Sequence, residues 1–217
     1  MQPLRLAVFL AFIVGLRAYA LTDSLAEFYC DVNGDYDDRE QVEKDGGDRS
    51  LIDLKLVPVV APSLSPLPVL YVVESIAGVL VRVLILIVTQ DPKGYIYTDP
   101  YNVTGKTDIK SGTFDVNQVK SLTPADLQGQ QDCKDVFEPV QPFVFAVNYP
   151  DCKETPVNGS RSSYGVTVTC NEFFAIVPAG APEKPTLVPY QFKRRGNKYQ
   201  LEDAPSNYVC DCDKPSN

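Results

Sequence analysis

The sequence predicts a mostly β fold, a single antiparallel barrel or sandwich with a few short helices. Apolar and polar residues alternate along several short segments, which is the pattern of strands that bury one face. Turn-forming residues separate these segments, and few helices interrupt them, as in antiparallel sheets. The chain has 217 residues, enough for one sizeable core, and no linker divides it into two domains.

Residues 1–20 have the pattern of a secretory signal peptide. Arg5 precedes an apolar run from Leu6 to Leu16, and Ala18-Tyr19-Ala20 is typical of a cleavage site. The apolar run is too short to cross a bilayer, so we expect a secreted, extracellular protein with no membrane span. Cleavage also removes Arg17 and takes the net charge from −8 to −10, which argues against nucleic acid as a partner.

The first half of the chain holds two expected helices and the longest expected strands. Asp23 to Tyr29 forms a short helical turn, and the acidic segment Asp35 to Lys44 begins a solvated helix in which Tyr36 faces inward. Strands are expected at residues 51–60, 69–75, 79–89 and 95–97, and a polar, flexible connection at residues 99–112.

The segment that starts at Asp31 opens like an EF-hand calcium loop. Tyr36 then stands where that loop needs glycine, and Val42 stands where it needs glutamate. We therefore expect no EF-hand, and at most weak calcium binding at the surface.

The second half begins with a short helix at residues 113–120. Thr123 is a helix N-cap, Pro124 suits the first helical position, and Asp126 can accept a hydrogen bond from the Thr123 N–H; Gly129 ends this turn. Strands are expected at residues 143–147, 164–169, 172–177 and 187–194, and the polar chain from Gly196 onwards is expected to cover an edge of the barrel.

The chain has six cysteines, an even number that suggests disulfides in an exported protein: Cys30, Cys133, Cys152, Cys170, Cys210 and Cys212. We expect the tail to fold back, so that Cys210 or Cys212 reaches Cys30 or Cys170. The Cys-x-Cys pair could instead be a redox or metal motif, although zinc would want histidine and the chain has none. Two N-glycosylation sequons, at Asn102 and Asn158, lie in loop-like stretches.

Four segments resemble, in order, motifs of the CpeT/CpcT family of phycobiliprotein bilin lyases. They are Gly34–Gln41, similar to G-x-(F/Y)-(D/S)-N-x-x-Q; Leu70–Glu74, similar to L-Y-V-E-Q; Leu122-Thr123-Pro124-Ala125-Asp126-Leu127 with a cysteine soon after; and Pro189–Arg194, similar to P-Y-x-F-x-(R/K). The chain departs from the pattern at Asp38 and Ser75, keeps one arginine, Arg82, of a P-Y-R-x-R segment, and lacks tryptophan.

This resemblance implies a calycin-like barrel over residues 21–195, followed by a cysteine-containing tail over residues 196–217. It also implies a Cys133–Cys152 disulfide. A barrel of this size can hold one small ligand in its mouth. In the family that ligand is a linear tetrapyrrole, which the lyase brings to a cysteine of a phycobiliprotein.

The available chemistry is narrow. The absence of histidine excludes Ser-His-Asp and Cys-His catalysis, and no phosphate-binding glycine motif is present, so no catalytic or metal-ligating residue is singled out. Arg82 is costly inside an apolar strand unless it is paired. It either lies at the rim or outer face, or points into the barrel and binds a carboxylate, such as a tetrapyrrole propionate. Tyr71, Glu74 and Arg82 are the candidate ligand-binding set.

Three hypotheses follow. The favoured one is a secreted barrel that binds a small amphipathic ligand, with a linear tetrapyrrole as the candidate, and without catalysis. The second is a bilin lyase, which needs a phycobiliprotein in the same compartment. The third is an acidic extracellular or biomineral matrix protein, which predicts surface calcium binding and a barrel interior plugged by side chains.

Overall fold

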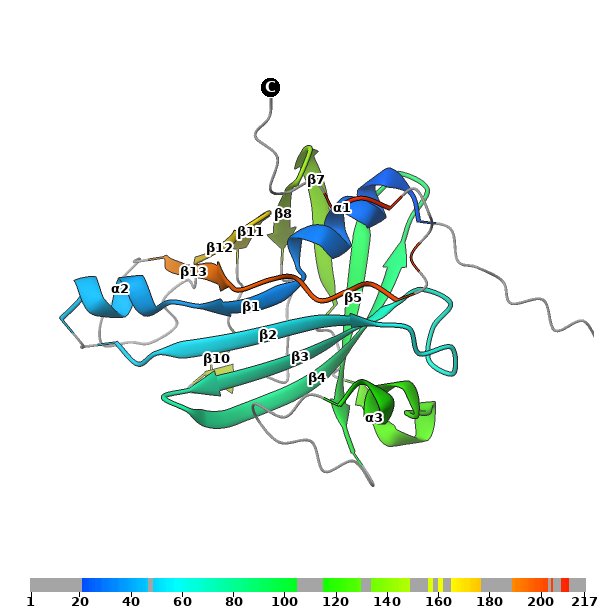
Figure 1. Ribbon diagram of the computed structural model, residues 1–217, viewed down its shortest axis with the longest axis horizontal. Helices are drawn as coiled ribbons and strands as arrows, with labels where there is room; N and C mark the ends of the chain where they lie inside the picture. The colour runs from blue at the N-terminus through cyan, green and yellow to red at the C-terminus, as the bar shows by residue number, and fades with distance from the viewer. Residues whose placement is uncertain are drawn as a thin grey trace, which may run out of the picture.

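The computed structural model describes residues 21–46, 49–104, 115–129, 134–148, 156–157, 160–161, 165–176, 189–202, 204 and 208–210. Its main sheet has eleven antiparallel strands in the order β4-β3-β2-β1-β13-β12-β11-β8-β7-β5-β6. Strand β4 also pairs with β5, which closes ten of these strands into a barrel and leaves β6 as an addition to β5 (Figure 1). The predicted mostly β, antiparallel barrel is therefore confirmed.

The strands of the main sheet are β1 (Gly34–Asp37), β2 (Ile52–Val59), β3 (Val69–Ile76), β4 (Val79–Gln90), β5 (Ile96–Val103), β6 (Leu127–Gly129), β7 (Asp135–Gln141), β8 (Val144–Asn148), β11 (Gly165–Thr169), β12 (Glu172–Ile176) and β13 (Tyr190–Arg195). A separate hairpin pairs β9 (Pro156–Val157) with β10 (Ser160–Arg161). The helices are α1 (Asp23–Asp31), α2 (Arg39–Lys44), α3 (Val116–Lys120) and a 3₁₀ turn at Pro124–Asp126.

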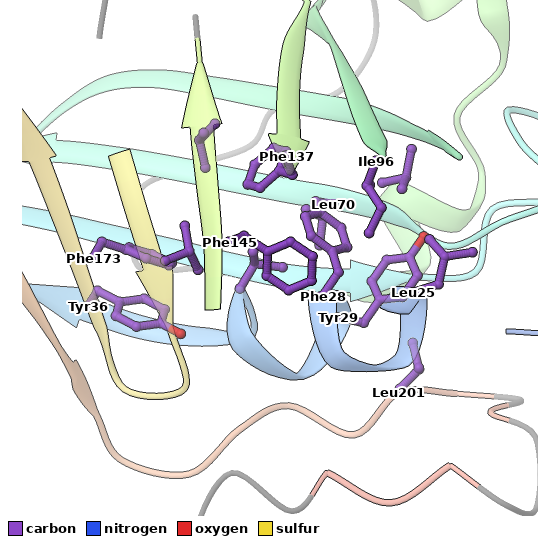
Figure 2. Packing of buried hydrophobic residues seen from close by; sticks show 14 of the residues in the cluster. Leu25, Phe28, Tyr29, Tyr36, Leu70, Ile96, Phe137, Phe145, Phe173 and Leu201 are labelled. Atoms are coloured by element: carbon purple, nitrogen blue, oxygen red, sulfur yellow. The ribbon is translucent and has the colours of Figure 1, made fainter. Parts of the chain in front are cut away.

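Helix α1 fills one end of the barrel. The helix starts at Thr22, whose Oγ1 accepts a 3.2 Å hydrogen bond from the Leu25 N–H. The Phe28 ring packs edge-on against the rings of Phe137 and Phe145, with centroids 4.9 and 6.0 Å apart (Figure 2). Because this inner core takes buried side chains from strands all around the barrel, α1 acts as a plug.

A second core lies on the outer face of β2, β3 and β4. Its buried members are Val57, Val59, Ala61, Val69, Tyr71, Val73, Ile85, Val119 and Leu122. Val119 comes from α3, which lies against the outside of the barrel wall (Figure 1). Alternate residues of β3 and β4 thus face two different cores, which explains why the sequence of β4 is apolar on both faces.

The predicted helix from Asp35 to Lys44 is wrong in its first half. Residues Gly34–Asp37 form strand β1, which pairs with β2 on one side and β13 on the other, and the helix begins only at Arg39. Gly34 has a φ of 145°, and a Cβ there would come within 3.0 Å of the Arg194 side chain. Tyr36 does face inward, where its ring stacks on Phe173 at 4.2 Å.

Two further expectations are corrected. The connection expected from residue 99 begins later, because residues 99–103 continue β5 and pair with β4 and β6. Strand β7 was not predicted at all, and the turn after Thr123 is a 3₁₀ turn that leads into β6. Pairing to neighbouring strands outweighs the polar composition of these segments. The Asp126 carboxylate does accept the Thr123 N–H, at 2.9 Å.

The C-terminal tail lies over the end of the barrel that α1 fills. The Asn33 side chain makes two hydrogen bonds to the Tyr199 backbone, at 2.7 and 2.9 Å, and Leu201 joins the inner core. A Cys30–Cys210 disulfide, one of the pairings left open by the sequence, fastens the tail to α1. Among the described residues, no helix combines the length and the apolar character needed to cross a membrane.

Candidate functional site

Arg82 lies on the inner face of the barrel wall. It shares this face of β4 with Leu84, Leu86 and Val88, and Val88 belongs to the inner core. Arg82 stands opposite Glu74 on β3, and the two side chains form a salt bridge. The side chain of Arg82 is 42% exposed and that of Glu74 is 15% exposed, so solvent reaches this part of the inner wall.

The local structure keeps Arg82 near an opening. The β3–β4 hairpin turns at Ala77 and Gly78, both with positive φ, which suits a tight two-residue turn. A bulge between Glu74 and Ser75 then shifts the register. Beyond it Val79 is 67% exposed, so the hairpin tip projects from the packed part of the barrel.

Tyr71 does not join this pair. It is on the opposite face of β3 from Glu74, is 1% exposed, and packs into the outer core. Burial raises the pKa of its hydroxyl to about 12. The structure therefore brings together two of the three predicted residues, Glu74 and Arg82, and gives Tyr71 a place in the outer core.

Asp135 is an inner-face residue that the sequence analysis missed. It is 3% exposed on β7, and its Oδ2 accepts a 2.9 Å hydrogen bond from Oγ1 of Thr98 on β5. Burial raises the pKa of the Asp135 carboxyl to about 7, and the charge of Asp99 adds to this rise. The hydrogen bond from Thr98 and the charge of Arg82 act in the opposite direction and lower the pKa. The signal that could have revealed strand β7 is its alternation, in which Asp135 and Phe137 lie on one face and Val136 on the other.

The inner wall thus has two different ends. At one end α1 and its aromatic neighbours exclude water. Towards the other end, Tyr36, Leu54, Glu74 and Arg82 stand side by side on β1, β2, β3 and β4, in that order. This row runs from a fully buried tyrosine to a solvated arginine, and Asp135 interacts electrostatically with the arginine. The arrangement can bind an anionic group beside an apolar surface.

Only some of the other predicted site residues belong to the part of the chain that the structure describes. Cys133, Cys152, Cys212 and Asn158 lie outside the described residues. Cys170 is disulfide-bonded, and Lys198 Nζ lies 3.3 and 3.2 Å from the two sulfurs of the Cys30–Cys210 bridge. Asn102 lies within strand β5, not in a loop. No group of three or more potential metal ligands occurs among the residues that the structure describes.

Two of the family-like segments lie next to each other. Strand β1, from Gly34–Gln41, pairs with β13, from Pro189–Arg194. Gln41 accepts the Gln191 N–H at 3.0 Å and donates to the Pro189 carbonyl at 2.8 Å. These residues have a structural role, because they join the start of the barrel to its last strand.

Comparison with known proteins shows a fold and no family. No family model matches the chain, and no curated protein matches it. Among solved structures, the CRL protein of Arabidopsis, in its selenomethionine form, superposes with a TM-score of 0.53. The two share 13% sequence identity, and the match covers 78% of this chain and 99% of that one. At this identity the likeness concerns the fold alone.

Proposed function

We propose that this protein is a binding protein for one small amphipathic ligand, held at the open end of the barrel with its carboxylate on Arg82. The observation that carries the proposal is a solvated arginine on the inner wall that forms a salt bridge with Glu74 on the neighbouring strand. A guanidinium presents several donors in one plane, so it can keep Glu74 and still accept a ligand carboxylate.

The apolar part of the ligand would lie against the inner wall. Leu84 and Leu86 follow Arg82 on the same face of β4, and Leu54 neighbours Glu74. Such a surface beside one charged group fits a molecule with an apolar body and an acidic end. Because α1 fills the far end, the ligand can extend only part of the way into the barrel.

A linear tetrapyrrole is the ligand class to test first. It combines a flat apolar ring system with two propionates, and the resemblance of four segments to CpeT/CpcT lyases motivates the choice. The proposal treats the chain as a divergent, secreted relative of that family that binds without catalysis, because no residue set for catalysis is evident in its sequence.

The test is a titration of the purified, oxidised protein with biliverdin, followed by visible absorbance. We expect a saturable red shift, and an affinity at least tenfold lower in the Arg82→Met variant, since a hydrogen-bonded charge pair contributes about 1.5–3 kcal/mol. Arg39→Met is the matched control, because that side chain is 57% exposed on α2 and should leave binding unchanged.

No spectral change at high micromolar biliverdin would refute the tetrapyrrole. Equal binding by wild type and Arg82→Met would refute the site. If biliverdin gives no spectral change, an acidic matrix protein becomes the better candidate. That hypothesis predicts a barrel interior filled by side chains, as it is around Phe28. Calcium binding would then be measured.

A further inference from the structure

A cavity of about 460 Å³ lies on the outer face of the barrel wall, away from Arg82. Its lining residues come from strands β1, β2 and β3, from the β3–β4 turn, from α2 and from Arg195 at the end of β13: Asp35, Tyr36, Asp37, Arg39, Asp53, Leu54, Lys55, Val73, Ser75, Gly78 and Arg195. This volume is in the range of small-molecule sites. None of Tyr71, Glu74 and Arg82 lines it.

Most of the charges in this cavity already have partners. Arg195 Nε donates a 2.9 Å hydrogen bond to Oδ1 of Asp37, and Arg195 Nη2 forms an ion pair with the same oxygen at 2.9 Å. Arg39 approaches the other oxygen of Asp37 at 3.4 Å. Asp35 accepts hydrogen bonds from the Tyr199 hydroxyl at 2.9 and 3.0 Å. These side chains form a fixed polar wall.

Two opposite charges in the cavity are left over. The side chains of Asp53 and Lys55, which face the same side of strand β2, make no hydrogen bond or ion pair with any other described residue. Asp53 stands directly opposite Asp37, and partial burial together with that neighbouring carboxylate raises its pKa. The charge of Arg39 opposes this rise, and a further positive group placed beside Asp53 would stabilise its carboxylate.

We propose that this cavity binds a zwitterionic α-amino acid, with its ammonium on Asp53 and its carboxylate on Lys55. The spacing fits. Two residues along a strand are about 6.8 Å apart. The ammonium nitrogen and the farther carboxylate oxygen of an amino acid are roughly 3.5 Å apart, and a hydrogen bond of about 2.8 Å at each end gives a span of up to roughly 9 Å, which the flexible lysine can meet.

The rest of the cavity suggests the side chain of that amino acid. Val73 contributes apolar surface to the lining and is 5% exposed within the outer core. Gly78 adds no side chain at the rim. An aliphatic amino acid such as leucine would bury its side chain there while both of its charges are matched.

The experiment is calorimetric titration of the oxidised wild-type protein with L-leucine. Two analogues of leucine are titrated in the same way: isopentylamine, which has only the ammonium, and 4-methylpentanoate, which has only the carboxylate. We expect leucine to bind at least tenfold more tightly than either, and to lose at least tenfold in affinity in Asp53→Asn and in Lys55→Met. Glu43→Gln and Lys93→Met remove the same charges at exposed positions and should bind like wild type.

The proposal is overturned if leucine gives no heat at millimolar concentration, if either analogue binds as tightly, or if both cavity variants keep the wild-type affinity. Circular dichroism of each variant shows whether it is folded. Should one variant unfold, the other, together with the two analogues, still decides the question.

Discussion

Arg195 and Asp37 join the last strand of the barrel to the first. Both Nε and Nη2 of Arg195 lie 2.9 Å from Oδ1 of Asp37, whose side chain is 4% exposed. Asp37 also accepts the Arg39 N–H at 3.1 Å. The closure of the barrel at β1–β13 therefore includes a nearly buried carboxylate that depends on one arginine from the other end of the chain.

We predict that Arg195→Met lowers the free energy of unfolding by about 1.5–3 kcal/mol, because it leaves the Asp37 carboxylate buried with fewer donors. Urea denaturation measures this. Arg39→Met is the control, and a loss of at most about 0.5 kcal/mol is expected there because its side chain is 57% exposed. Equal effects of the two variants would contradict the assigned role of Arg195.

Phe28→Ala should be among the most damaging single changes. The side chain is 0% exposed and has ring contacts with Tyr29, Phe137 and Phe145. Removing it leaves a cavity between helix and barrel, at a cost of about 3–5 kcal/mol. Val79→Ala, at a position 67% exposed, should change stability by less than about 0.5 kcal/mol in the same denaturation experiment. A loss below about 1 kcal/mol in Phe28→Ala would mean that α1 does not plug the barrel.

The Cys30–Cys210 bridge spans a sequence separation of 180 residues. Bridges that close loops this long contribute about 3–5 kcal/mol in the chain-entropy description. The Cys30→Ala/Cys210→Ala double variant should be destabilised by that amount, with its tail more open to limited proteolysis than in wild type. If both proteins denature at the same urea concentration and are cut at the same rate, the bridge does not hold the tail.

The buried carboxyl of Asp135 gives a pH dependence with a definite sign. Its pKa is raised by burial, from the ordinary 3.8 to about 7. The folded state therefore binds more protons than the unfolded state between these values, and stability from this group falls as the pH rises from about 4 to about 7. The slope is at most about 1.4 kcal/mol per pH unit.

Comparison of wild type with Asp135→Asn isolates this effect, since all other titrating groups are shared. The free energy of unfolding is measured for both proteins at pH 5, 6, 7 and 8. We expect the stability of Asp135→Asn relative to wild type to increase up to about pH 7 and to stay constant above it. A difference that is constant over this range would show that Asp135 is ionised throughout.

Sequence reasoning found the elements whose pattern is local. The strands around residues 51–60, 69–75 and 79–89 have alternating or continuous apolar runs between turn residues, and the structure has strands there. Asp35–Asp37 was expected to be helical, because its acidic composition hides the fact that these residues pair with β2 and β13. No local signal reports a partner 158 positions away in the sequence.

Sequence reasoning found only part of the candidate site, because some of its contacts are between residues close in the sequence and others are not. A lone arginine in an apolar strand is conspicuous, and Glu74 precedes it by eight positions across one hairpin. Tyr71 was assigned to the cavity because the sequence does not say that both faces of β3 are covered. Asp135 and Thr98 come together only because β5 pairs with β7, which no spacing in the sequence predicts.

The most direct test of ligand binding inside the barrel is a titration of the isotope-labelled protein with biliverdin, followed by amide chemical shifts. Binding at the open end predicts saturable shifts at Glu74, Arg82 and Leu84. Shifts confined to the outer face, or no shifts at a concentration several times that of the protein, would contradict a ligand held on the inner wall by Arg82.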